Sequence, residues 1–390
     1  MVSWRTALTG VCILIWTATA ALGNSMNGGP GLHYVSSAWT LKQGHLTTKA
    51  QTRFFGKVSP NSAVTVWDIQ GAMSINYGIT EHLEMQLSPI IYQDSHKGEG
   101  GNGYNLPDDL FLSFKLGSYR LKSSSMAYGF MLQTRFPTAQ NHNVVFEPYS
   151  AGTVSWGLKA LGTYSRDPLY PEDNMNVFLN IGYYNHNDVG QKLSEDQEID
   201  SLKVSSMTQE FVYSMGICLP NAEFDFSLEL HGTTYLSKPP RETAYSLESF
   251  AYLTPGISYH VNRWLTFNFG ADIRVSPNKD ESLYYFDKKI TGMPNYPAWR
   301  INLGMKMQIL PTDVFKVSEK DILIKKAESR RELFEQIIRE QRETESAEEE
   351  LERIKNERRK AERELERLRR ILEGEYKKSD ENVNDKDQNE

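Results

Sequence analysis

Residues 298–309 of this 390-residue chain read AWRINLGMKMQI, and this stretch decides the fold. From Trp299 to Ile309 every second residue is apolar, and the residues between them are charged, polar or glycine. A period of two places alternate side chains on opposite faces of an extended strand. The stretch therefore predicts a β-strand with one apolar and one polar face.

The same alternation recurs along the preceding sequence. It is strong at 223–231 and 264–275. Weaker alternation occurs near 46–55, 64–77, 82–93, 108–119, 126–136, 151–163, 175–187, 202–217 and 250–261. Strands of about 10–13 residues are longer than those of most soluble proteins and match a tilted bilayer crossing. We therefore expect an all-β transmembrane antiparallel β-barrel of about 12 strands between residues 46 and 310.

The connections between these segments alternate in length. Short turns fall at 78–81, 120–125, 219–221 and 261–263, with a medium one at 166–173. Long polar loops fall at 56–63, 95–107, 137–150, 188–201, 237–249 and 277–297. Bacterial outer-membrane barrels turn tightly on the periplasmic side and carry their long loops outside the cell. An even strand number then places both ends of the barrel in the periplasm.

Two features leave alternatives open. A less regular candidate at 32–41 belongs to the N-terminal segment 24–45, which is either an irregular, lumen-lying or strand-extending segment or a thirteenth strand. A secreted soluble β-sandwich would also alternate apolar and polar faces. That fold would have to bury all these long apolar faces in one very large core, whereas a barrel turns them toward lipid.

Composition narrows the functional classes. Beyond residue 23 no segment approaches the roughly 20 consecutive apolar residues of a membrane-spanning helix, which excludes a polytopic helical membrane protein. The formal net charge is −7 and there is no basic domain, so we expect no nucleic-acid partner.

The N-terminus predicts export. Arg5 precedes the apolar stretch 6–16, and Ala18-Thr19-Ala20 offers a signal-peptidase site, so residues 1–23 read as a cleaved signal peptide. An uncleaved anchor helix is the alternative. Cys218 is then the one cysteine of the mature chain, which leaves no intramolecular disulfide.

Two hairpin motifs resemble a known family. Residues 77–85 read YGITEHLEM, and residues 254–259 read TPGISY, followed by the turn 262–265. Both resemble hairpins of outer-membrane barrels named for the meta-pathway of phenol degradation and of their transporter-like relatives. The resemblance implies a Gram-negative outer-membrane protein of porin-like, transport type that the barrel-assembly machinery inserts. The motifs lie in turns, so no solute specificity follows from them.

The residues after the predicted barrel differ from it in composition. Such barrels usually end at an aromatic residue of the last strand, whereas here about 80 residues follow Leu310. After a linker at 311–317, Ser318 can cap a helix, and residues 318–373 contain neither proline nor glycine and are rich in Glu, Lys and Arg. We expect a charged helix or coiled coil there, in the periplasm, and a disordered acidic tail at 374–390.

The helix carries an interrupted heptad seam. The candidate association residues are Leu351, Ile354, Leu365, Leu368 and Leu372. A seam of this spacing favours a homo-oligomeric coiled coil or a contact with peptidoglycan or another periplasmic partner. The alternative is a single solvated helix stabilised by charge pairs four residues apart.

The sequence contains no recognisable catalytic, metal-binding or phosphate-binding motif. The eight histidines are scattered without metal-ligand spacing, and the glycines at 98–103 do not form a phosphate-binding loop. Asp108-Asp109 and the pair His142 and Ser150 occur without the surrounding motifs of barrel proteases or phospholipases. We therefore expect no enzyme, no metal and no cofactor.

The polar faces of the strands supply the functional candidates. If the apolar faces meet lipid, the charged residues that line the lumen are Asp68, Glu84, Lys115, Arg135, Lys159, Asp225, Glu229, His231, Asp272, Arg274, Arg300 and Lys306, accompanied by Gln70, Gln86 and Asn180. Both charge signs are present, which is compatible with a passive channel for small polar solutes. They are equally compatible with structural ion pairs that close a narrow lumen. A third hypothesis is a non-conducting barrel that anchors the periplasmic helix to peptidoglycan or an envelope partner.

Overall fold

The computed structural model describes residues 29–58, 65–96, 102–121, 124–168, 171–193, 203–221, 223–278, 281, 295–312 and 319–384. The chain separates into two units, Met1–Lys316 and Val317–Glu390. The predicted signal peptide at 1–23, most of the linker at 311–317 and the last six residues of the predicted tail lie outside the described residues.

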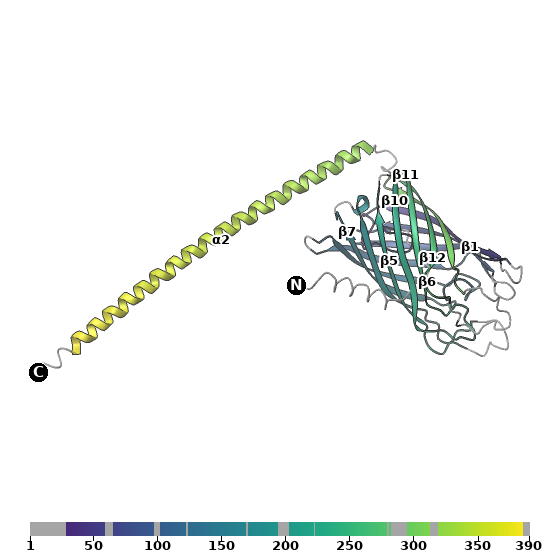
Figure 1. The fold of residues 1–390 in the computed structure, drawn as a ribbon, viewed down its shortest axis with the longest axis horizontal. Helices are drawn as coiled ribbons and strands as arrows, with labels where there is room; N and C mark the ends of the chain where they lie inside the picture. Colours follow the sequence, from purple (N-terminus) through teal and green to yellow (C-terminus); the bar gives the residue numbers. More distant parts are fainter. Residues whose placement is uncertain are drawn as a thin grey trace. The chain divides into compact units, whose positions relative to one another are not determined.

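Twelve long antiparallel strands form the first unit (Figure 1). They are β1 (Leu46–Val58), β2 (Thr65–Gly78), β3 (Leu83–His96), β5 (Leu110–Arg120), β6 (Met126–Phe136), β7 (Ser155–Ser165), β8 (Asn176–Asn185), β9 (Gln209–Leu219), β10 (Phe224–Ser237), β11 (Phe250–Asn262), β12 (Leu265–Arg274) and β13 (Trp299–Leu310). Each strand pairs with its neighbour in sequence, and β1 pairs with both β2 and β13. The sheet is therefore closed, and the predicted 12-stranded barrel is confirmed.

Closure joins the first long strand to the last. The register of β1 with β13 runs from Leu46 opposite Leu310 to Phe54 opposite Ile301. Because both neighbours of every long strand are present, the barrel leaves none of them as an exposed edge. A 3-10 turn, η1 (Pro171–Asp173), lies in the connection between β7 and β8.

One short extra strand lies inside a predicted loop. β4 (Asn102–Asn105) pairs with the end of β3, from Gln93 opposite Asn105 to His96 opposite Asn102. The sequence predicted a loop at 95–107. Four paired residues are too few to produce a recognisable period, which explains why this strand was not predicted.

The two faces of the barrel wall differ as predicted. Apolar side chains on the outer face are largely exposed, for example Phe130 at 58%, Ile181 at 48% and Phe269 at 48%. Their polar neighbours on the inner face are buried, for example Asn180 at 3% and Gln133 at 0%. The interior of this barrel is thus mainly polar, the inverse of a soluble domain.

One predicted strand begins later than expected. The sequence predicted a strand at 202–217, but β9 starts at Gln209. The preceding residues bond to the adjoining loop instead of to the sheet: the Gly190 amide donates to the Val204 carbonyl, and the Thr208 amide donates to Asp188. These loop contacts satisfy the backbone groups that a longer strand would have paired.

The N-terminal segment 29–44 lies inside the barrel without joining the sheet. Its only bridge outside the named strands is between Gly31 and Ser36. Its backbone amides bond to side chains of the wall, among them Ala38 to Thr163 and Leu41 to Glu84. The candidate strand at 32–41 is therefore an irregular, lumen-lying segment.

The second unit is one helix, α2 (Glu319–Asn384), of 66 residues. Its described side chains are exposed, and ion pairs four residues apart join Arg331 to Glu335 and Arg358 to Glu362. The helix continues past Gly374, whereas the sequence predicted its end at 373 and a disordered tail. A glycine costs a helix only about 1 kcal/mol relative to alanine and ends it only when the following residues leave the helical conformation. No helix of the described chain is long and apolar enough to cross a membrane.

Candidate functional site in the barrel lumen

All twelve charged residues predicted to line the lumen lie on the inner face of the barrel. Eight are buried, namely Asp68, Glu84, Lys115, Lys159, Glu229, His231, Asp272 and Arg300. Four are half-buried, namely Arg135, Asp225, Arg274 and Lys306. Charges removed from water need partners, so their contacts show how the lumen is organised.

A network of guanidinium and carboxylate groups crosses one side of the lumen. Arg300 Nε lies 3.6 Å from Asp68 Oδ2, and Arg300 Nη2 donates to the Phe146 carbonyl at 2.6 Å. Arg53 on β1 forms an ion pair with Glu147. Asp68 also accepts hydrogen bonds, at 2.9 Å and 2.8 Å, from the side chains of Gln93 and Ser95. Strands β1, β2, β3 and β13 are thereby joined to the connection between β6 and β7.

A second network holds the N-terminal segment. The Glu229 carboxylate accepts the backbone N–H groups of residues 33, 34 and 35 at 2.9–3.0 Å. Tyr34 donates its hydroxyl hydrogen to Asp272 at 2.7 Å, and its ring stacks on His231 with 3.9 Å between centroids. Strands β10 and β12 thus bind the segment through charge-assisted and aromatic contacts.

The other charged candidates have individual partners, with one exception. Lys115 Nζ lies 3.0 Å from Glu84, and Lys306 Nζ donates to the Gly29 carbonyl at 3.1 Å. Asp225 pairs with His260 at 2.8 Å, and Arg274 donates to the Tyr296 carbonyl at 2.9 Å. The side chain of Lys159 forms no hydrogen bond or ion pair with a described residue.

The connection between β6 and β7, residues 137–154, folds inward over the long-loop end of the barrel. Val145 and Phe146 pack in a buried cluster with Phe55 and Val66 of the wall. The Tyr149 hydroxyl donates to Asp188 at 2.7 Å. This inward loop and the N-terminal segment fill much of the described lumen.

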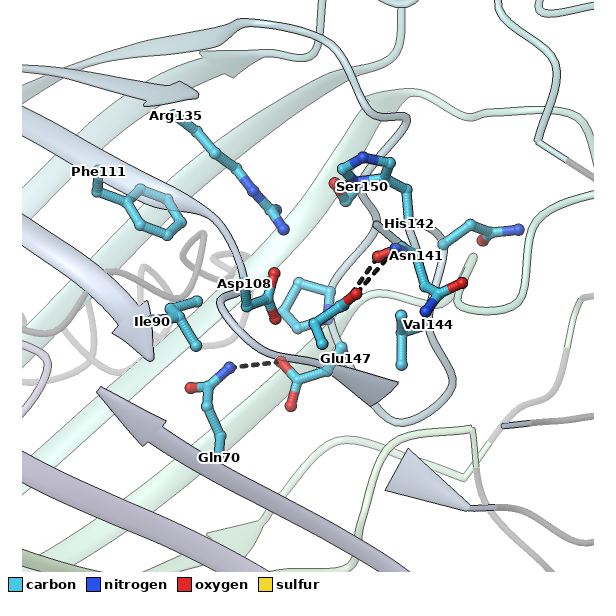
Figure 2. A pocket seen from close by; sticks show the side chains of 13 residues that line it. Gln70, Ile90, Asp108, Phe111, Arg135, Asn141, His142, Val144, Glu147 and Ser150 are labelled. Carbon is cyan, nitrogen blue, oxygen red and sulfur yellow. Dashed lines mark hydrogen bonds between the residues drawn. The ribbon is translucent and has the colours of Figure 1, made fainter. Parts of the chain in front are cut away.

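A pocket of about 360 Å³, part of it open to solvent, remains beside the inward loop (Figure 2). It is lined by Gln70, Ile90, Asn105, Asp108, Phe111, Arg135, Asn141, His142, Asn143, Val144, Glu147, Pro148 and Ser150. Asn105 and Asn141 exchange two hydrogen bonds of 2.8 Å and 2.9 Å, and Gln70 donates to Glu147 at 3.5 Å. The pocket therefore lies between the loop and strands β2 to β6.

The ionisable groups of this pocket are held in different states. Burial raises the pKa of Asp108 to about 7. Burial opposes the ionisation of Glu147, but the guanidinium groups of Arg53 and Arg300 outweigh it and lower the pKa of Glu147. Burial also lowers the pKa of His142. The pocket thus presents a neutral imidazole, one firmly ionised carboxylate and one carboxyl group that titrates near neutrality.

The structure brings the two pairs noted in the sequence close together, because Asp108, His142 and Ser150 all line this pocket and Asp109 follows Asp108. Asp109 forms an ion pair with Arg135 and accepts the Ala139 amide at 3.1 Å, so it fastens the loop to β6. Ser150 Oγ lies 3.5 Å from His142 Nδ1, the outer limit of a hydrogen bond. Among the described residues, no group of three or more His, Cys, Asp or Glu could hold a metal ion.

Several residues of these networks were missing from the sequence prediction. Arg53 follows Lys49 and Gln51 on the inner face of β1, so the period-two signal could have identified it. Glu147 and Tyr34 lie in irregular segments, where periodicity does not indicate which side chains point inward. Only their contacts reveal their role.

Solved structures similar to this chain include a porin, an outer-membrane channel and a toluene transporter. The NanC porin is 11% identical over 68% of this chain and 100% of its own, with a TM-score of 0.42. The COG4313 outer-membrane channel from Pseudomonas putida F1 is 11% identical over 70% of this chain and 98% of its own, with a TM-score of 0.45. The toluene transporter TodX of Pseudomonas putida is 10% identical over 75% of this chain and 99% of its own, with a TM-score of 0.35.

No family model and no curated protein matches the chain. Membership of the phenol-degradation subgroup stays a prediction. At these identities and TM-scores, function has to be derived from the residues of the chain itself.

Proposed function

We propose that the chain is an outer-membrane β-barrel that acts as a passive channel for small polar solutes. The observation that carries the membrane assignment is the outer face of the wall. Exposed apolar side chains occur on strands all around it, for example Leu132 on β6, Leu179 on β8 and Leu303 on β13. Soluble monomers rarely expose contiguous apolar patches larger than a few hundred Å², whereas a lipid-facing barrel needs such a surface.

The inner face supports conduction of polar solutes. It carries both charge signs in a closed wall, with the polar side chains turned toward the lumen. The inward loop and the N-terminal segment obstruct this path, but side-chain contacts and single backbone hydrogen bonds, such as Ser118 to Ala38, hold them rather than strand ladders. Their displacement would leave all twelve wall strands paired. We assign the described conformation to the closed state of the channel.

The alternation of turns supports an orientation. The long connections lie at the end of the barrel opposite Leu46 and Leu310, and long loops of bacterial barrels face outward. Helix α2, which follows β13 in the chain, then belongs to the periplasm, and the barrel-assembly machinery would insert the wall strands.

Conductance of the full chain in planar bilayers tests the proposal. The loop is held by the Arg53–Glu147 ion pair, so Glu147→Gln should weaken its attachment and raise the open probability at least several-fold. Glu81→Gln, at an exposed residue of the β2–β3 turn, is the matched control and should behave as the wild type. Mature protein that stays soluble without detergent and is absent from the outer-membrane fraction would contradict the membrane assignment.

A second candidate is a non-conducting barrel that anchors α2 to peptidoglycan or an envelope partner. Two observations favour it, namely the filled lumen and a helix of 66 residues, which at 1.5 Å per residue reaches about 100 Å. If neither the wild type nor Glu147→Gln conducts in bilayers, this anchoring function replaces the channel.

A further inference from the structure

Lys159 is the exception among the charged groups of the lumen. It is 5% exposed, and no described charge or hydrogen-bonding group pairs with it, whereas Lys115 is paired with Glu84. Its side chain leans across β8, because an ideal Cβ on Gly182 would lie 2.8 Å from Lys159 Cγ and 2.8 Å from Val212 Cγ2. The absence of a side chain at Gly182 thus leaves room for the lysine to extend toward β9.

Three neighbouring side chains also carry polar atoms without partners. Asn180 Oδ1, Ser214 Oγ and His231 Nδ1 are buried and form no hydrogen bond in the described structure. They lie on adjacent strands in directly opposed positions, since Asn180 pairs with Ser214 and Ser214 pairs with His231 across the sheet. Opposed side chains lie about 5 Å apart, so the three form one continuous polar row on β8, β9 and β10.

The N-terminal segment borders the row on one side, and residues of the wall border it on the other. On the short-turn side, Val35 of the N-terminal segment packs on Phe178 and Cys218. On the long-loop side, Tyr184 packs on Val212. Across β7 and β8, Lys159 lies opposite Gly182 and Asn180 lies opposite Leu161, so Lys159 and the polar row occupy neighbouring inward positions of the wall.

An unpaired buried ammonium group is costly, and it favours an anion as its partner. One lysine supplies a single positive charge. The amide of Asn180, the hydroxyl of Ser214 and the imidazole of His231 can supply hydrogen bonds to oxygen atoms without adding charge. A monovalent oxyanion with two equivalent oxygens, which is a carboxylate, matches this set.

We propose that Lys159, Asn180, Ser214 and His231 form a binding site for a small organic carboxylate. The site deepens the proposed function, on which it rests, by naming the class of solute that the channel takes. Lys159 supplies the charge, and the row on β8 to β10 orients the carboxylate oxygens. The apolar neighbours Met131 and Leu161, buried on the inner face beside Lys159, pack with Ala38 of the N-terminal segment and so close the site on that side.

The test is isothermal titration of the full chain in detergent with sodium acetate and sodium lactate, against chloride and inorganic phosphate at equal ionic strength. The wild type should bind the carboxylates more tightly than chloride. Lys159→Met should weaken carboxylate binding at least tenfold, and Lys159→Arg should retain most of it. Ser214→Ala should weaken it about threefold to tenfold, the usual effect of one lost hydrogen bond.

Lys115→Met removes the same charge at the paired lysine and is the matched control, which should bind carboxylate as the wild type does. If that variant does not fold, Lys57→Met at the exposed end of β1 replaces it. Wild-type protein that binds no carboxylate, that prefers phosphate, or that loses binding equally in Lys159→Met and the control overturns the site. Binding in detergent needs no bilayer, so a protein that binds carboxylate without conducting retains the site and fails only as a channel.

Discussion

The barrel and helix α2 both carry many charged residues, but they stabilise them in opposite ways. In the barrel, the partners of buried charges are far apart in sequence: Arg300 donates to Phe146, 154 positions away, and Tyr34 bonds to Asp272, 238 positions away. In α2 the ion pairs join residues four positions apart, as in Arg358 and Glu362, and the described side chains are exposed. The partners of charged side chains are thus determined by tertiary structure in the barrel and by local sequence spacing in α2.

This difference has an energetic consequence. A buried ion pair contributes little net stability, but removal of one partner leaves the other charge uncompensated away from water. An exposed pair four residues apart contributes only about 0.3–0.5 kcal/mol, because water solvates either partner alone. Matched substitutions in the two units should therefore have very different effects.

The largest effect is expected at Arg300. Arg300→Met leaves Asp68 without its guanidinium partner and removes the hydrogen bond to the Phe146 carbonyl. The free energy of unfolding should fall by about 3–5 kcal/mol. Urea unfolding in detergent micelles measures it, with the folded barrel followed by its mobility in gel electrophoresis without heating.

The matched control for this substitution is Arg358→Met in α2. It removes the exposed pair with Glu362 and should leave barrel unfolding unchanged while altering the helix by less than about 0.5 kcal/mol. If the Arg300→Met barrel unfolds at the same urea concentration as the wild type, the buried pair with Asp68 does not contribute to the stability of the barrel.

The same contrast explains what the sequence could predict. All twelve long strands were recognised, because each has one face toward the polar lumen and one toward the apolar exterior over most of its length, which imposes a period of two. The twelve inward charges followed from that period. The inward position of Glu147 could not be predicted in this way, because residues 137–154 have no regular period. Which of their side chains point inward depends on contacts with Arg53 and Arg300, which are distant in sequence.

For α2, the sequence predicted the helix but neither its C-terminal end nor its association. Its existence was predictable from local composition, but the helix continues through Gly374 to Asn384 because one glycine does not outweigh the helix formers around it. Whether the seam associates depends on a second molecule, which no pattern within one chain can determine. The association residues stay a prediction.

A smaller effect is expected at Asp108, where the long-loop end of the barrel responds to pH. Burial raises the pKa of Asp108 to about 7, well above its usual value, so the folded loop favours the protonated carboxyl group. The stabilisation is complete below about pH 4 and is lost as the pH rises through 7. Between pH 6 and pH 8 the closed loop should lose about 1 kcal/mol, since one pKa unit corresponds to about 1.4 kcal/mol.

Hydrogen exchange of residues 137–154 at pH 6 and pH 8, corrected for the intrinsic exchange rates, measures this loss. Asp108→Asn should remove this loss and leave the opposite change that His142 contributes, since its lowered pKa makes the closed loop gain stability as the pH rises through 6.5. Glu147 does not contribute in this window, because its lowered pKa keeps it ionised at both pH values. Glu81→Gln should retain the wild-type pH dependence. A loss of protection from pH 6 to pH 8 that persists in Asp108→Asn would assign this loss to another group.

The smallest effect on the barrel is expected from the seam of α2, although the effect on association should be complete. Leu351, Ile354, Leu365 and Leu368 are 53–66% exposed in the single chain. Apolar side chains at heptad spacing lose this exposure when a second helix packs against them. Leu365→Glu with Leu368→Glu should therefore abolish chemical cross-linking between full-length chains in detergent, with barrel unfolding unchanged. Arg353→Gln with Lys360→Gln, which changes the net charge equally outside the seam, should cross-link as the wild type does. A wild-type chain that remains monomeric in sedimentation would leave α2 as a single charged helix, stabilised by local pairs alone.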